Sequence, residues 1–189
     1  MEKNIIDAKS INNKILNSKN ILLATHKNPD SDAVGSICAL SKYLDFLKKP
    51  YTLFSLDQPL ENYSYIQNSS LIKSDIYGLN PNDFDLIITL DSSDLTHVGL
   101  NSFVNKNHYL INIDHHPTNT YFGNINLVIP HAVSTTEILF NLFSNLALQI
   151  SANTATCLLA GIFGDTNNFT NHNTTDASLK AASRLLSLG

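Results

Sequence analysis

The spacing of apolar residues predicts helices and strands that alternate along the chain. Helical spacing, with an apolar residue at every third or fourth position, covers residues 4–18 and 33–48. Short apolar runs at 20–25 and 51–54 predict one strand after each of these helices. The first quarter of the chain therefore predicts the order helix, strand, helix, strand.

Two later apolar runs have the pattern of strands that are buried on both faces of a sheet. These runs are FDLIITLD, which ends at Asp91, and HYLINID, which ends at Asp114. NLVIP predicts a further short strand, whereas residues 55–83 are polar and irregular and leave room only for a short helix. The continuous apolar runs favour a parallel sheet.

Three helices are predicted in the last third of the chain. The helix from Ser134 to Leu148 starts with Ser134 and Glu137 at the spacing of a capping box. Residues 152–163 predict a buried helix and 175–188 an amphipathic one. Strands that alternate with helices in this way predict an α/β fold, with a mostly parallel sheet and helices on both faces.

Composition limits the classes of function. The net charge is -4 and the 12 basic residues form no cluster, so we expect no binding to long duplex nucleic acid. The N-terminus is polar and no apolar run reaches the roughly 18 residues of a membrane span, which predicts a soluble cytoplasmic protein without membrane contact. Cys38 and Cys157 lie in apolar helical patterns, which favours core packing for both.

Ionisable residues follow four of the predicted apolar segments. The carboxyl ends of parallel strands line one crevice of an open sheet, so the first three groups are expected to converge and the fourth can join them. The groups are His26 with Asp30 and Asp32; Asp91; Asp114 with His115 and His116; and Asp165.

Each group also has a simpler explanation. Asp32 could be only a helix N-cap, and Asp165 could merely end a helix. Four groups at the same kind of position nevertheless favour one shared site. Four Asp and two His suit Mn²⁺ or Mg²⁺ better than a structural Zn²⁺, and they are enough for two ions with a bridging carboxylate. Such ion pairs, about 3.5–4 Å apart, catalyse in-line displacement at phosphorus.

Five segments in this order resemble the DHH phosphoesterases, and the likeness covers nearly the whole chain. The branch it resembles most is the bacterial oligoribonuclease and pAp-phosphatase type, where pAp is 3′-phosphoadenosine 5′-phosphate. That branch is related to cyclic-dinucleotide phosphodiesterases. The segments are HKNPDSDAVGS, LIITLDSSD, NIDHHPTNTYFGNINLVIP, STTEI and GIFGDTNNFTNHNTT.

The resemblance implies a role for each residue of the constellation. One Mn²⁺ would be bound by His26 and Asp30, the other by Asp32, His115 and Asp165, and Asp91 would bridge them. His116 would contact the scissile phosphate or the leaving oxygen, and Asp114 would orient the two histidines. Gly35 would let a helix pack closely on a strand.

Two further expectations come from the places where the chain departs from the family. His97 stands where relatives often carry Arg, which makes it a candidate substrate contact, and Ser31 stands where they often carry Gly. Relatives continue into a smaller domain with a Gly-rich, His-containing motif that this sequence lacks. Residues 1–189 are therefore expected to form the catalytic domain, ending in or near the linker helix to a C-terminal domain.

The function implied is hydrolysis of phosphate esters in short oligoribonucleotides (nanoRNA) or pAp by a hydroxide that two Mn²⁺ ions activate. Mg²⁺ or Co²⁺ are possible substitutes, and a homodimer is compatible with the sequence. The alternatives are a cyclic-dinucleotide phosphodiesterase, a manganese inorganic pyrophosphatase and a non-catalytic nucleotide-binding module. A degenerate module should have lost ligands, whereas all six and His116 are present.

Overall fold

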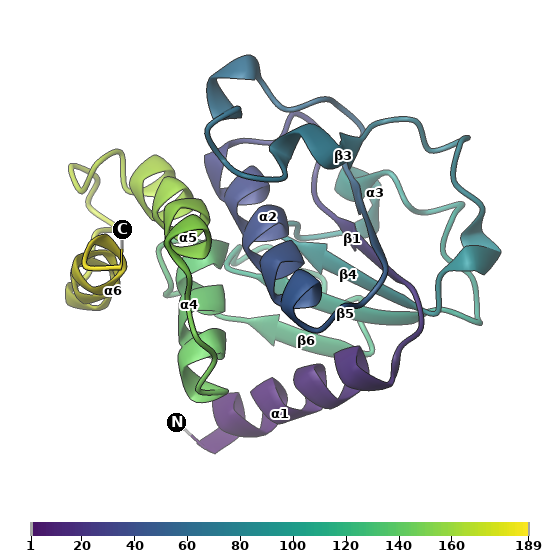
Figure 1. Cartoon of the computed structure of the whole chain (residues 1–189), viewed down its shortest axis with the longest axis horizontal. Helices are drawn as coiled ribbons and strands as arrows, with labels where there is room; N and C mark the ends of the chain where they lie inside the picture. The colour runs from purple at the N-terminus through teal and green to yellow at the C-terminus, as the bar shows by residue number, and fades with distance from the viewer. Residues whose placement is uncertain (1, 189) are drawn as a thin grey trace.

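A parallel sheet forms the centre of the computed structural model, which describes residues 2–188, with side chains from residue 8 onward (Figure 1). Within this range the sheet has six strands in the order β3-β2-β1-β4-β5-β6, and all neighbouring strands are parallel. The strands are β1 (Ile21–Ala24), β2 (Tyr51–Phe54), β3 (Ile72–Lys73), β4 (Leu86–Leu90), β5 (Tyr109–Asp114) and β6 (Ile125–Val128).

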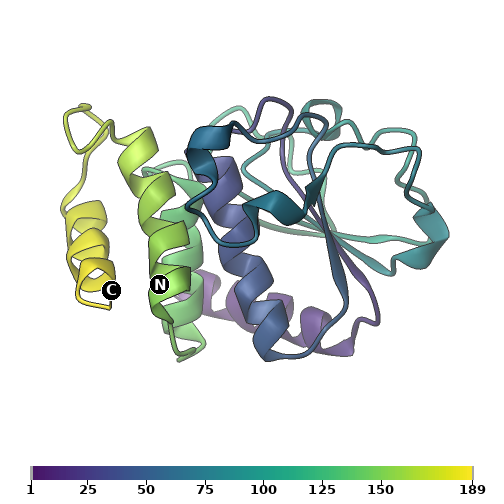
Figure 2. The ribbon, with the colours of Figure 1, turned by 45° about the horizontal axis from the view of Figure 1, so that its top comes forward.

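The helices are divided unequally between the two faces of the sheet. The larger apolar core lies on one face of the sheet, where α1, α2 and α4 contact the strands. The helix α5 packs on α2 and α4, and α6 is outermost (Figure 2). The other face is covered by the short α3 and by irregular segments around Phe84 and Phe103. The helices are α1 (Glu2–Asn17), α2 (Ser31–Phe46), α3 (Leu95–Val98), α4 (Thr135–Asn145), α5 (Ala152–Asp165) and α6 (Asp176–Leu186).

The predicted α/β fold with a parallel sheet is therefore confirmed. Residues 55–83 contain more structure than their polar pattern predicts: the edge strand β3 and three 3-10 helices at Glu61–Tyr63, Ser69–Leu71 and Pro81–Asp83. The helix α3 was also not predicted, because four residues are too few to show a helical period.

The start of α4 differs from the capping box that the sequence predicts. The Ser134 hydroxyl accepts a hydrogen bond from the Glu137 amide at 3.1 Å, as expected. The Glu137 carboxylate instead accepts from the Val133 amide at 2.8 Å, one residue before the cap. Only half of the capping box therefore forms.

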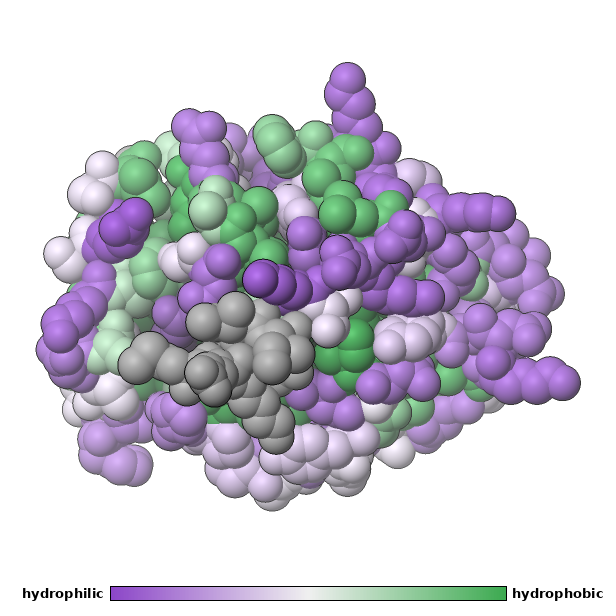
Figure 3. All heavy atoms as spheres, turned by 90° about the horizontal axis from the view of Figure 1, so that it is seen from below, coloured by the Kyte–Doolittle hydropathy of each residue, from purple (hydrophilic) through white to green (hydrophobic). Residues whose placement is uncertain are grey.

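The described surface carries no sign of a membrane span. Among residues 2–188, no helix has both the length and the apolar character needed to cross a bilayer. Seen from the side of α1, hydrophilic side chains are interspersed with smaller apolar patches (Figure 3).

The strand order fixes where a site can form. The strands β1 and β4 are neighbours, but the chain leaves β1 toward β2 and leaves β4 toward β5, on the opposite side. The crossover after β1 runs through α2 on one face, and the crossover after β4 runs through α3 on the other. This reversal opens a crevice beyond the carboxyl ends of β1 and β4, the usual position of ligand sites in open α/β sheets.

Candidate metal centre

The six residues expected to bind metal lie together at this crevice. Ligand atoms of His26, Asp30 and Asp91 lie within 4.8 Å of one another, and the same holds for Asp32, His115 and Asp165. A third set of the same kind joins Asp91 with His115 and His116. The structure thus forms two groups of donors with Asp91 between them.

Asp91 occupies the centre of the cluster. Its Oδ2 lies 3.5 Å from Nε2 of His26, and its Oδ1 lies 3.6 Å from Nε2 of His115. The Thr135 hydroxyl donates to the same Oδ1 at 3.0 Å. The backbone of Asp91 is left-handed, with φ of 57°, a conformation that is uncommon for non-Gly residues and often found at functional sites. Each carboxylate oxygen therefore faces a different imidazole.

The orientation of the two imidazoles is fixed by backbone carbonyls. Nδ1 of His26 lies 2.7 Å from the carbonyl oxygen of Lys27, and Nδ1 of His115 lies 3.3 Å from that of Ala132. A carbonyl only accepts, so Nδ1 carries the proton in both rings. In the neutral rings Nε2 is then an unprotonated donor atom aimed at Asp91, the arrangement that metal-binding histidines usually have.

Asp32 is fully buried and is held by the first turn of α4. The Thr135 amide donates to Oδ2 at 2.7 Å, and the Thr136 amide and hydroxyl donate to Oδ1 at 2.9 Å and 2.7 Å. Both threonines lie in the STTEI segment of the family resemblance, but no role was predicted for either of them.

Asp30 has the capping role that was considered for Asp32. Its Oδ1 accepts from the amides of Asp32 at 2.9 Å and Ala33 at 3.0 Å, so Asp30 is the N-cap of α2. The capping explanation for Asp32 is therefore wrong, because its carboxylate turns away from its own helix toward α4.

Two glycines make room for the contact between α2 and α5. A Cβ atom on Gly161 would collide with Oδ1 of Asp32 and with the Thr136 hydroxyl. One on Gly35 would collide with the carbonyl oxygen of Cys157 in α5. The expectation that Gly35 serves packing of a helix on a strand is wrong, since the close approach is between two helices.

The cluster has an excess of acidic groups. Burial, together with the charges of Asp91 and then Asp30, raises the pKa of Asp165 to about 8. Burial and the charges of Asp91 and Asp165 raise the pKa of Asp32 well above its usual value. Burial opposes the protonation of His26, but the hydrogen bond to Asp91 outweighs it with the other contacts and raises the pKa of His26 to about 9.

The missing positive charge does not come from basic side chains. Within the described part of the chain, no Lys or Arg forms an ion pair with Asp32, Asp91 or Asp165. Buried carboxylates are costly without a compensating charge. Carboxylate oxygens and unprotonated imidazole nitrogens are good donors for divalent ions, so the set fits bound metal.

His116 differs from His115 in what its ring contacts. Nδ1 of His116 lies 2.7 Å from Oδ1 of the fully buried Asp114 and 3.8 Å from Oδ1 of Asp91. The hydrogen bond to Asp114, only partly offset by burial, raises the pKa of His116. Because Asp114 occupies Nδ1, the atom that remains available to a ligand is Nε2.

His97 belongs to none of the three sets of donors. It lies on α3, with Nδ1 3.1 Å from Oδ2 of Asp94, and its side chain is 57% exposed. Its carbonyl oxygen accepts from the Lys27 amide at 3.0 Å, so α3 is joined to the segment that carries His26. His97 therefore lies beside the crevice without belonging to the cluster.

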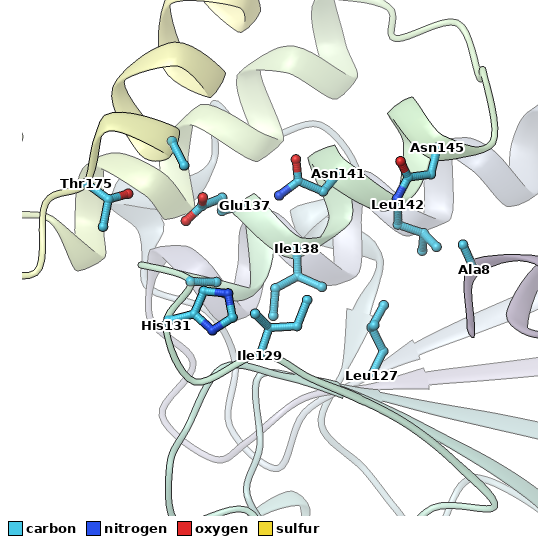
Figure 4. A pocket seen from close by; sticks show the side chains of 12 residues that line it. Ala8, Leu127, Ile129, His131, Glu137, Ile138, Asn141, Leu142, Asn145 and Thr175 are labelled. Carbon is cyan, nitrogen blue, oxygen red and sulfur yellow. The ribbon is translucent and has the colours of Figure 1, made fainter. Parts of the chain in front are cut away.

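A separate cavity of about 510 Å³ lies between β6 and α4 (Figure 4). Glu137 and Asn141 face it from α4, with Ile129 and Leu127 on the opposite side (Figure 4). None of the six clustered residues lines this cavity.

Comparison with known proteins gives the class and the family. Residues 20–162 match the model described as DHH family, N-terminal domain, which together with the acidic cluster places the fold and the site in the class of metal-dependent phosphoesterases. The match covers most of the chain. The chain belongs to the DHH family.

Three similar proteins show how far the likeness extends. The bifunctional oligoribonuclease and PAP phosphatase NrnA of Thermus thermophilus is 32% identical over 89% of this chain and 50% of its own length. The chain thus spans about half the length of this curated relative. The crystal structure of an exopolyphosphatase-related protein from Bacteroides fragilis has a TM-score of 0.91 at 24% identity, covering 97% of this chain and 57% of that one. RecJ from Thermus thermophilus, in complex with Mn²⁺, has a TM-score of 0.56 at 16% identity, covering 95% and 26%. At these identities the two structures show the fold alone.

Proposed function

We propose that this domain is the catalytic part of a phosphoesterase that uses two Mn²⁺ ions to hydrolyse short oligoribonucleotides, pAp or both. The observation that carries the proposal is the position of Asp91, a buried carboxylate whose two oxygens face Nε2 of His26 and Nε2 of His115. Such a carboxylate suits a bridge between two ions.

The proposed ligands follow the two groups of donors. His26 and Asp30 would hold one ion, Asp32, His115 and Asp165 the other, and Asp91 both. A pair of divalent ions supplies charge for the phosphoryl oxygens and lowers the pKa of a water nucleophile. Mn²⁺ is favoured because the donor set mixes carboxylates with imidazoles and because RecJ binds it. Mg²⁺ and Co²⁺ are the expected substitutes.

The side chains around the ions have separate tasks in this proposal. His116 contacts the scissile phosphate or the leaving oxygen through Nε2, and Asp114 holds the ring by its other nitrogen. His97, exposed beside the crevice, contacts a more distant part of the substrate. None of these tasks needs a basic surface, which agrees with the net charge of -4.

The choice of substrate rests on the relative. NrnA of Thermus thermophilus, named for action on oligoribonucleotides and PAP, is 32% identical to this chain. Cyclic dinucleotides and pyrophosphate would suit the same metal chemistry and are therefore the comparison substrates of the test. The cytoplasmic location that the sequence leads us to expect is part of this proposal.

The experiment compares His115→Ala with His116→Ala in the longest natural form of the protein. His115→Ala should lower the bound metal and the turnover together, with partial rescue by excess Mn²⁺. His116→Ala should keep the metal while turnover falls about 10²–10⁴-fold, the usual scale for loss of a general acid or charge stabiliser. Elemental analysis and product analysis on a trinucleotide, pAp, cyclic di-AMP and pyrophosphate provide the readouts.

His108→Ala is the matched control. His108 is buried but remote from the cluster, bonded to Asn105 and to the carbonyl oxygen of Pro81, so its loss should lower stability without lowering metal content. Equal metal loss from His115→Ala and His116→Ala would contradict the division of roles. Turnover of pyrophosphate alone would contradict the proposed substrate.

A further inference from the structure

A buried amide holds the second oxygen of the Asp114 carboxylate. Oδ1 of Asp114 accepts from His116, and Oδ2 accepts from Nδ2 of Asn119 at 2.6 Å. Asp114 is fully buried and Asn119 is 7% exposed. With a donor on each oxygen, the plane of this carboxylate is fixed, and so is the direction from which it holds His116.

Asn119 is in turn fixed from both ends of its amide group. Its Oδ1 accepts from the Tyr121 backbone amide at 2.7 Å, and its Nδ2 also donates to Oδ1 of Asn112 at 2.7 Å. Nδ2 of the fully buried Asn112 donates to the Thr89 hydroxyl at 3.0 Å. Since Thr89 lies in β4 and Asn112 in β5, the network ties His116 to the centre of the sheet.

The hydrogen bonds of the network require asparagine at position 119, and side chains of similar size or chemistry cannot make them. The side chain must donate to a carboxylate and accept from a backbone amide in the same place. Aspartate would bring a second carboxylate against Asp114, and a leucine of similar size has neither donor nor acceptor. The longer glutamine would have to displace its neighbours in a fully packed site.

We infer that Asn119 is a positioning residue for the hydrolysis, which acts through Asp114 to keep the His116 imidazole in its working orientation. This inference rests on the proposed function, in which His116 contacts the phosphate or the leaving oxygen. Asn119 itself touches neither substrate nor metal ligand in this role. Partners of this indirect kind typically change activity by about 10–100-fold.

A double-mutant cycle tests the inference with the trinucleotide substrate. Asn119→Ala should lower kcat about 10–100-fold and leave KM and the bound metal nearly unchanged. In the His116→Ala background the same change should have almost no further effect, because the group it positions is absent. Fully multiplicative effects of the two substitutions would overturn the inference.

The matched control is Asn126→Ala. Asn126 holds the same loop, accepting from the Gly123 amide at 2.9 Å and donating to the Gly123 carbonyl at 2.7 Å. Within the described part of the chain, no hydrogen bond joins its side chain to Asp114. It should lower stability as Asn119→Ala does while kcat is retained. An equal loss of kcat in Asn126→Ala would show that the loop, and not the amide on Asp114, is what matters.

A structural readout separates this inference from the proposed function. In a crystal structure of Asn119→Ala, the His116 ring should leave the single orientation that it has in the wild-type protein, while His115 stays in place. An unchanged and well-ordered His116 ring would overturn the inference even if the protein proved to have another activity. If wild-type protein cleaves none of the substrates but the ring moves as expected, the proposed function fails and the positioning role of Asn119 stands.

Discussion

Asp30 and Asp32 are two residues apart in one motif, yet they are held in opposite ways. Asp30 is exposed, and among the described residues its side chain accepts hydrogen bonds only from amides of its own helix. Asp32 is fully buried and takes three hydrogen bonds from Thr135 and Thr136, more than a hundred positions further along the chain. The first carboxylate is organised locally and the second by the tertiary fold.

This difference divides the cluster into an outer and an inner part. The side chains of the outer part, His26 and Asp30, have hydrogen-bond partners a few residues away in the chain. The inner part consists of Asp32, His115 and Asp165. It depends on the packing of α4 and α5 around Asp32. Loss of the Asp32 carboxylate should therefore disturb the fold and metal binding together. Loss of the Asp30 charge should affect metal binding alone, provided that the side chain still caps α2.

The largest effect is expected at Asp91, which the two parts share. Asp91→Ala should lower turnover more than about 10³-fold, beyond the usual cost of one lost charge stabiliser, because in the proposed site both ions would lose a ligand. Asp91→Asn should do nearly as much, since a neutral amide is a poor bridge. Turnover at limiting Mn²⁺ with elemental analysis measures this, and Asp94→Asn, which keeps the N-cap of α3, is the control. Near-normal turnover in either variant would refute the bridging role.

The pair Asp32→Asn and Asp30→Asn tests the comparison directly. Asn caps a helix as well as Asp does, so Asp30→Asn should keep the melting temperature of the metal-free protein and weaken Mn²⁺ binding in a way that excess Mn²⁺ reverses. Asp32→Asn should lower turnover about 10²-fold or more without such rescue, because its amide nitrogen would face one of the three donors. Identical behaviour of the two variants would remove the distinction between the parts.

Gly161 and Gly164 test the packing of the inner part. Gly161→Ala places a methyl group against Asp32 and Thr136 and should cost about 1–3 kcal/mol of unfolding free energy. Gly164→Ala, in the same helix, meets only the Ser31 side chain, which can rotate, and should be close to neutral. Urea unfolding of the metal-free proteins measures both. Equal destabilisation would show that the effect belongs to the helix and not to the contact with Asp32.

The smallest effect expected is a release of protons on metal binding. At pH 7 the metal-free protein holds a proton on His26, with a pKa of about 9, and on Asp165, with a pKa of about 8. Mn²⁺ must displace these protons, so its affinity should rise with pH up to about 9. Calorimetry in buffers of different ionisation enthalpy counts the protons released. An affinity that stays constant over this range would contradict the expectation.

Much of the fold could be predicted from the sequence because the long helices have a clear period and the central strands are short apolar runs. β1 and β4 are continuous apolar runs, and α2 begins two residues before its predicted start at position 33. The edge strand β3 has two residues and α3 has four, too short for any period to appear. Their positions depend on pairing with β2 and on packing over the second face of the sheet.

The convergence of the six donors was also accessible, because parallel strands bring their carboxyl ends to one edge. Their roles as metal ligands stay predictions. Contacts between distant segments were not accessible: the bonds from Thr135 and Thr136 to Asp32, and the approach of Gly35 to α5, join residues about a hundred or more positions apart. Sequence periodicity describes one element at a time and contains no information on such pairs.

The two cysteines are natural probes of how often the helices around this site open. Cys38 lies in α2 and Cys157 in α5, both fully buried, and burial raises the pKa of the Cys157 thiol to about 11. A thiol in this state reacts only when its surroundings open. Since α2 carries Asp32 at its start and α5 carries Asp165 at its end, the rate of thiol labelling reports how often the helix pair that holds these carboxylates separates.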